Sequence, residues 1–107
     1  MSKDAKHTGL AGEVSMEQMS AFFKVLSDKT RLSILMELLD ASLCVMHISE
    51  RVGMSQSAIS HQLAILRKAD LVRVKRNGKT LVYSISDEHV RLMLDMAMLH
   101  INEEGKQ

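Results

Sequence analysis

Four residues near the end of the chain have side chains that can bind a divalent metal ion. Asp87 and His89 stand two positions apart, at a predicted helix start where irregular backbone can turn both inward. His100 and Glu103 stand three apart, which places them on one face of a helix. The two pairs are separated by about 16 Å along a helix, whereas zinc ligands lie about 2.0–2.2 Å from the metal. One chain therefore cannot bring both pairs to one ion.

Two copies of the chain can do so if they cross antiparallel about a two-fold axis. Asp87 and His89 of one copy then meet His100 and Glu103 of the other, and symmetry creates two equivalent sites per dimer. Two imidazoles and two carboxylates suit tetrahedral Zn(II); Co(II) binds similarly, and Ni(II) prefers more ligands. The alternative is that Asp87 caps the helix, both histidines lie in an interface, and Glu103 is a solvated charge.

The helix that carries these residues is predicted to run from Asp87 or Glu88 to about Glu103. Its apolar residues face nearly every direction, and a terminal helix in a chain of 107 residues cannot bury all of them against its own core. We therefore expect a homodimer that packs through the terminal helices. These apolar residues are Val90, Leu92, Met93, Leu94, Met96, Ala97, Leu99 and Ile101.

Two earlier helices are joined by a short turn and form a helix-turn-helix candidate. The first is predicted from about Met46 to Val52, Gly53 permits the turn, and Ser55 caps a second helix that ends near Lys68. The outer face of the second helix is small and polar with a basic end, so it can enter a major groove of DNA. The candidate DNA contacts there are Gln56, Ser57, Ser60, His61, Arg67 and Lys68.

Residues 71–85 alternate between apolar and polar types on both sides of Asn77-Gly78, which predicts a β-hairpin. Four cations flank its tip, namely Arg73, Lys75, Arg76 and Lys79. Residues 51–80 as a whole carry seven cations and one anion. Such a hairpin is typical of the wing of a winged helix, where cations neutralise DNA phosphates without specifying a base sequence.

The remaining chain fits a single domain over residues 15–104. Residues 1–14 lack apolar periodicity and are predicted to be a flexible arm, and residues 105–107 a short tail. Ser15 begins a capping box for a helix that ends near Leu26, and a second helix is expected from about Thr30 to Leu39. The absence of proline and the 3% aromatic content favour a mainly α-helical protein.

Composition also limits where and how the protein works. No stretch approaches the roughly 20 apolar residues that span a membrane, so no membrane partner is expected. A single cysteine, Cys44, fits a reducing cytoplasm and excludes an internal disulfide. The nucleophile, P-loop and metalloprotease motifs of common enzymes are missing, and four protein ligands leave no open position on a metal. We therefore expect a protein that is not an enzyme.

Several segments together resemble the ArsR/SmtB family of winged-helix metal-sensing repressors. They are FFKVLSDKTRLSILMELL, SLCVMHISERVGMSQSAISHQLAILRKADLV, RNGKTLVYSI, and DEHV followed by HINE. The resemblance implies a cytosolic homodimer that binds operator DNA when metal-free and releases genes for metal efflux or sequestration when metal binds. It also implies zinc ligands on the terminal helix, because the pattern of the zinc-sensing branch falls on Asp87, His89, His100 and Glu103.

The resemblance points to a second metal site near the start of the third helix. Cys44 matches a family cysteine, and His47 stands where the family usually has aspartate. An accessory site of Cys44, His47 and His7 is one interpretation, and a small apolar role for Cys44 is the other. Two further hypotheses for the whole protein are a winged-helix repressor with a redox or small-molecule inducer and a metal-binding structural protein.

Overall fold

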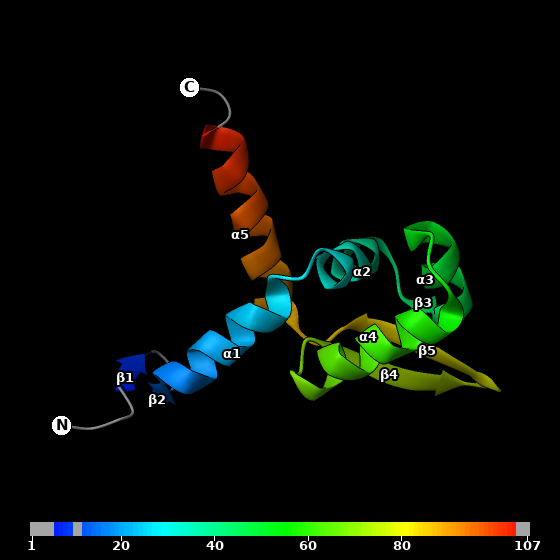
Figure 1. Cartoon of the computed structure of the whole chain (residues 1–107), viewed down its shortest axis with the longest axis horizontal. Helices are drawn as coiled ribbons and strands as arrows, with labels where there is room; N and C mark the ends of the chain where they lie inside the picture. Colours follow the sequence, from blue (N-terminus) through cyan, green and yellow to red (C-terminus); the bar gives the residue numbers. More distant parts are fainter. Residues whose placement is uncertain (1–5, 10–11, 105–107) are drawn as a thin grey trace.

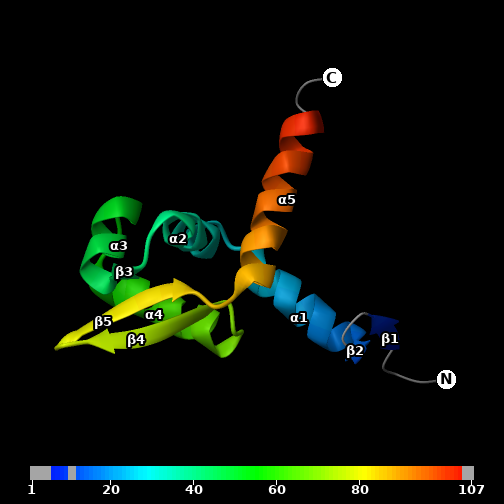
Figure 2. The ribbon, with the colours of Figure 1, turned by 180° about the vertical axis from the view of Figure 1, so that it is seen from behind.

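Five helices and three short strands form a winged helix-turn-helix (Figure 1). The computed structural model describes residues 6–9 and 12–104. A terminal helix, α5, projects away from the other elements in both Figure 1 and Figure 2. In chain order the main elements are α1 (Met16–Leu26), α2 (Lys29–Asp40), β3 (Leu43–Cys44), α3 (Val45–Val52), α4 (Gln56–Lys68), β4 (Val72–Asn77), β5 (Thr80–Ile85) and α5 (Glu88–Glu104).

Side chains next to the helix starts explain where several helices begin. The predicted capping box of α1 is confirmed: Ser15 Oγ accepts from the Gln18 N–H at 3.1 Å, and Gln18 Oε1 accepts from the Ser15 N–H at 2.9 Å. The start of α2 was not assigned a cap in the sequence, but Asp28 accepts from the Arg31 N–H at 3.0 Å. These bonds satisfy backbone donors that have no partner within the helix.

The helix-turn-helix is present with the predicted turn and cap. Helix α3 ends at Val52, and Gly53 follows with φ of 79°, a left-handed conformation that glycine adopts without strain. Helix α4 begins after Ser55, whose Oγ accepts from the Ala58 N–H at 3.1 Å. The two helices pack against each other, and Ile48 and Ile59 are fully buried.

The wing belongs to a three-stranded antiparallel sheet in the order β3-β5-β4. The predicted hairpin is confirmed, but its turn lies one residue later than expected. Asn77 pairs with Thr80, so Gly78 and Lys79 form the two-residue turn, and Gly78 has φ of 66°. Glycine at the first turn position is typical of type II′ hairpins. The third strand, Leu43–Cys44, was not predicted because two residues show no periodicity.

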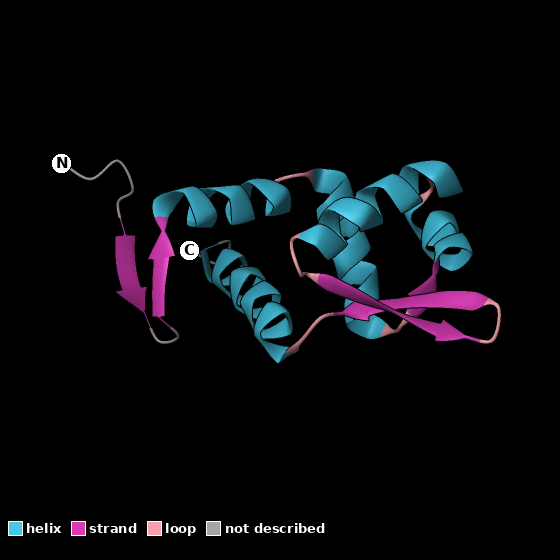
Figure 3. Ribbon diagram, turned by 90° about the horizontal axis from the view of Figure 1, so that it is seen from below, coloured by secondary structure: helices cyan, strands magenta, loops and turns pink. Residues whose placement is uncertain are grey.

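The N-terminal segment, which the sequence predicts to be a flexible arm, contains two short strands. Strands β1 (Lys6–Gly9) and β2 (Gly12–Ser15) pair antiparallel and precede α1 (Figure 3). The difference has a local explanation, because Gly12 at φ of 118° allows the chain to reverse where the sequence shows no alternating pattern. The short tail predicted at residues 105–107 lies outside the described residues.

One core joins α2, α3, α4, the sheet and the first turns of α5. Figure 3 shows the sheet along one side of these helices. The described residues include no helix with the length and apolar character that crossing a membrane requires. The buried apolar residues are Leu26, Ile34, Leu35, Leu38, Leu43, Ile48, Ile59, Leu63, Leu66, Leu71, Val72, Ile85, Val90 and Leu94.

Candidate functional site

The outer face of α4 is available to a ligand along its whole length. The opposite face is buried through Ile59, Leu63 and Leu66, which fixes the orientation of α4 about its own axis. Ser60, Arg67 and Lys68 also line a shallow hollow beside β5 that Tyr83 closes. All six residues predicted to contact DNA from this helix are exposed: Gln56, Ser57, Ser60, His61, Arg67 and Lys68.

A side chain from α2 holds α4 in place, and sequence reasoning missed it. Arg31 donates from Nη1 to Gln62 Oε1 of α4 at 3.0 Å and from Nε to the Val25 carbonyl of α1 at 2.8 Å. One guanidinium therefore ties together three helices. The partners are 31 residues apart in one case, so no local pattern reveals the contact.

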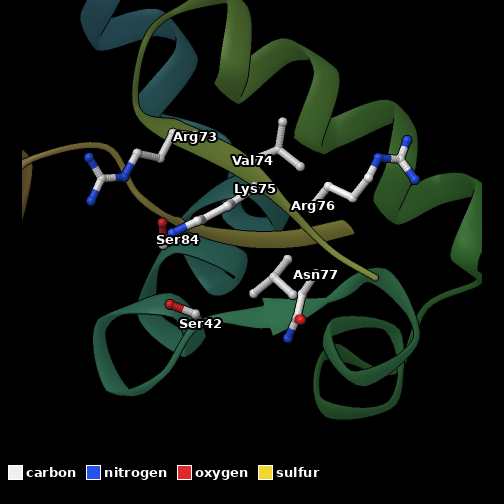
Figure 4. Close-up of a pocket in the computed structure, with 8 residues that line it drawn as sticks. Ser42, Arg73, Val74, Lys75, Arg76, Asn77 and Ser84 are labelled. Carbon is white, nitrogen blue, oxygen red and sulfur yellow. The ribbon is translucent and has the colours of Figure 1, made fainter. Parts of the chain in front are cut away.

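The wing cations divide between the two faces of the sheet. Val74 is paired with Tyr83, which faces α4. Because side chains alternate along a strand, Arg76 shares the α4 side, whereas Arg73 and Lys75 face away from it. Figure 4 shows the same division, with Arg76 extending toward α4. The prediction treated these cations as one group, and the register separates them.

At the start of α5, Asp87 and His89 lie together at the surface. Asp87 Oδ1 accepts from the Val90 N–H at 3.1 Å and lies 3.4 Å from His89 Nδ1. The hydrogen bond from the Val90 N–H, and then the nearby His89, hold the pKa of Asp87 below its ordinary value. The His89 side chain is 93% exposed. Asp87 thus caps the helix, and its ionised carboxylate could also bind a metal ion beside the accessible imidazole of His89.

His100 and Glu103 lie at the other end of the same continuous helix, and both are exposed. Eleven residues of α-helix make about three turns, so His100 points to the same side as His89. In the part of one chain that the structure describes, no three metal-binding side chains come together. Each pair therefore needs donors from elsewhere to complete a four-ligand site.

An apolar stripe runs along the same side of α5. Leu92, Met96 and Leu99 are 52%, 61% and 52% exposed, and their spacing places them beside the two histidines. The opposite side of the helix holds Val90 and Leu94, which are buried in the core. Arg91 fastens this base by donating to the Leu39 carbonyl of α2 at 2.7 Å. The two candidate metal-ligand pairs therefore flank an apolar surface that the described part of this chain leaves exposed.

The accessory site has two of its three predicted members in contact. Cys44 Sγ and His47 Nδ1 lie 3.4 Å apart at the start of α3. Cys44 is half-buried and His47 is exposed. The side chain of His7 lies outside the described part of the structure.

Comparison with known proteins places the chain among bacterial regulators. Residues 28–74 match the family described as bacterial regulatory protein, arsR family. The chain is 42% identical to the transcriptional regulator NmtR of Mycobacterium tuberculosis, over 78% of this chain and 69% of that protein. It is 38% identical to the transcriptional repressor SmtB homolog of Synechocystis, over 81% of this chain and 66% of the relative. The aligned segment thus spans about two thirds of each relative.

Solved structures agree with this assignment. The antimony-specific transcriptional repressor AntR superposes with a TM-score of 0.74 at 32% identity, covering 98% of this chain and 93% of that one. A homodimeric winged helix-turn-helix DNA-binding domain from Mycobacterium bovis gives 0.79 at 27% identity, covering 83% and 82%. The relatives named here are regulators and not enzymes, as the sequence predicted. The chain therefore belongs to the ArsR/SmtB family of bacterial winged-helix transcriptional regulators.

Proposed function

We propose that this protein is a zinc-responsive repressor of the cytoplasm whose homodimer binds operator DNA when metal-free. Filling of two sites between the subunits lowers its affinity for the operator and allows transcription of genes for metal efflux or sequestration. The observation that carries this proposal is on α5. Two pairs of nitrogen and oxygen donors lie on one side of a projecting helix, on either side of an uncovered apolar stripe.

The donor set supports a metal and favours zinc. Asp87 and His89 are already within 3.4 Å of each other, and the lowered pKa of Asp87 keeps its carboxyl ionised. A partner that supplies His100 and Glu103 would complete two nitrogen and two oxygen ligands, which suits tetrahedral Zn(II) or Co(II) better than Ni(II). When bound, the ion supplies a cross-link between the two terminal helices.

The DNA-binding surface consists of α4 and the wing. The exposed hydroxyl, amide and imidazole groups of α4 are suited to base edges in a major groove. Arg76 and the turn residue Lys79 are suited to phosphates beside it, and so are Arg67 and Lys68 at the end of α4. Arg73 and Lys75, which the sequence also predicts to contact DNA, have side chains on the far face of the sheet.

The first experiment measures fluorescence anisotropy of a labelled duplex taken from upstream of the gene. Protein is titrated at one fixed salt concentration, first with a chelator and then with stoichiometric Zn(II), because protein–DNA affinity depends strongly on salt. We expect tight binding that zinc weakens by tenfold or more, and His100→Gln should abolish the zinc effect. Asp95→Asn, which alters an exposed α5 residue outside the proposed ligand set, is the matched control. Tight binding to the duplex that Zn(II) does not weaken would reject the proposed metal response, whereas the proposed DNA-binding function would stand.

A mixed dimer tests whether each site spans two subunits. One subunit carries Asp87→Asn with His89→Gln, and the other carries His100→Gln with Glu103→Gln. Neither variant alone has an intact site. In the mixed dimer, one site combines both altered halves and the other combines both native halves, so Co(II) absorbance should report one tetrahedral site per dimer. A mixed dimer that binds no Co(II) would contradict the intersubunit arrangement.

A further inference from the structure

The face of the wing sheet that points away from α4 carries a hollow of about 700 Å³. Its floor is formed by Val82 and Ser84 of the central strand β5, with Arg73 and Lys75 along β4 and Ser42 just before β3. The neighbouring β4 residues Val74, Arg76 and Asn77 complete the lining. This volume falls within the range of about 300–1,000 Å³ that is typical of sites for small molecules. The hollow is therefore large enough for a small ligand.

The charge of the hollow is of one sign. Its lining includes no aspartate or glutamate. Among the described residues, neither Arg73 nor Lys75 forms an ion pair. Arg73 stands at the rim, where it also borders a smaller hollow with Asp87 and Glu88. An unpaired ammonium and a guanidinium that share a concave surface attract an anion.

The geometry of the side chains suits a phosphate group in particular. Register places Arg73 opposite Ser84 and Lys75 opposite Val82, so both cations lie above the floor of the hollow. In Figure 4 Lys75 extends to the side of β4 on which Ser84 and Ser42 lie, whereas Val74 and Arg76 extend to the other side. The two hydroxyls and the two cations are all hydrogen-bond donors, and phosphate oxygens accept several such bonds at once.

We propose that this hollow binds a small phosphate-bearing anion, separately from operator DNA. A duplex lying along α4 would meet the side of β4 toward which the Arg76 side chain extends, away from the side chains of Arg73 and Lys75. The ligand is one with two or more clustered phosphate charges, such as a diphosphate group. The hollow is distinct from the proposed metal site because no α5 residue is part of its lining, and Arg73 at the rim is the one lining residue that also borders Asp87.

The test uses inorganic pyrophosphate as the probe and isothermal titration calorimetry at constant ionic strength. The full-length protein should bind one pyrophosphate per chain. Arg73→Gln with Lys75→Gln should weaken binding by about tenfold or more, the scale of one lost hydrogen bond to a charged group. Arg67→Gln with Lys68→Gln, the control variant, removes the same charge from the end of α4, where neither residue lines the hollow, and should change the affinity by less than about twofold. Absent saturation, or equal weakening in both variants, would overturn the proposal.

A second measurement separates a free phosphate compound from the phosphates of DNA. The slope of log affinity against log salt counts the DNA phosphates that the protein contacts. For operator binding, the outer-face variant (Arg73→Gln with Lys75→Gln) should keep the slope of the wild type. The control variant should reduce the magnitude of the slope by about one or two. The reverse result would assign the hollow to the DNA backbone and reject a small ligand. Urea unfolding verifies that both variants fold. If the outer-face variant does not fold, Lys75→Gln alone replaces it.

Discussion

Truncating the exposed apolar stripe of α5 should convert the proposed dimer into a monomer. The perturbation is Met96→Ala with Leu99→Ala, and alanine, the best helix-forming residue, preserves the helix at both positions. Burying a whole leucine or methionine side chain contributes about 1.5–3 kcal/mol. Met96 is 61% exposed and Leu99 is 52% exposed, so roughly half of that contribution is still available to a partner.

A two-fold axis applies each substitution twice. Four truncated side chains should therefore cost the dimer about 3–6 kcal/mol. At about 1.4 kcal/mol per tenfold, the dissociation constant of the dimer should rise by about two to four orders of magnitude. Sedimentation equilibrium over a wide range of protein concentrations measures this constant directly. Circular dichroism verifies that α5 remains helical.

The chain offers a matched control at the other end of the molecule. Met46→Ala with Leu81→Ala truncates the same two residue types at positions that are 48% and 40% exposed on α3 and the wing. This variant should dimerise like the wild type. If both variants weakened the dimer equally, or if neither did, the α5 stripe would not be the dimer interface.

Three further predictions concern the elements that position the DNA-binding surface. Arg31→Ala should lower the free energy of unfolding by about 1.5–3 kcal/mol in urea, because it leaves Gln62 and a backbone carbonyl without their charged donor; an unchanged unfolding midpoint would contradict the bridge. Ser55→Ala should cost about 1 kcal/mol through loss of the α4 cap, with the exposed Ser60→Ala on the same helix as the control, because Ser57 contacts the capping hydroxyl; equal losses would argue against capping. Gly78→Ala should cost about 1–2 kcal/mol, because it puts a Cβ at φ of 66°; thermal unfolding measures this, and a neutral result would mean that the turn rearranges.

The elements that depend on local chemistry could be predicted from the sequence. The α1 capping box and the Ser55 cap each involve residues three positions apart, and both are found where expected. The wing turn was displaced by one residue because Asn77-Gly78 and Gly78-Lys79 are both acceptable turns. Pairing along the whole of β5 decides between them.

The features that depend on distant residues could not be predicted. The bridge from Arg31 to Gln62 joins positions 31 apart, and the division of the wing cations follows from strand register. The candidate metal site lies between these cases. Spacing predicts both donor pairs, and the structure places them on one side of α5 without joining them. The four-ligand set stays a prediction because, in the proposed arrangement, its second half belongs to a second copy of the chain.

Among the described residues, the buried side chains and the hydrogen bond that fasten α5 to the core lie near its first residue, so a small tilt there moves the far end of the helix. Val90, Arg91 and Leu94, which fasten it to the core, all lie in its first two turns. About 15 Å of helix extends beyond Leu94, so a tilt of about 10° at the base shifts the far end by roughly 2.5 Å. That shift exceeds the length of a zinc–ligand bond. A change at Arg91, a residue that binds no metal in the proposed arrangement, should therefore alter ligand geometry at His100 and Glu103.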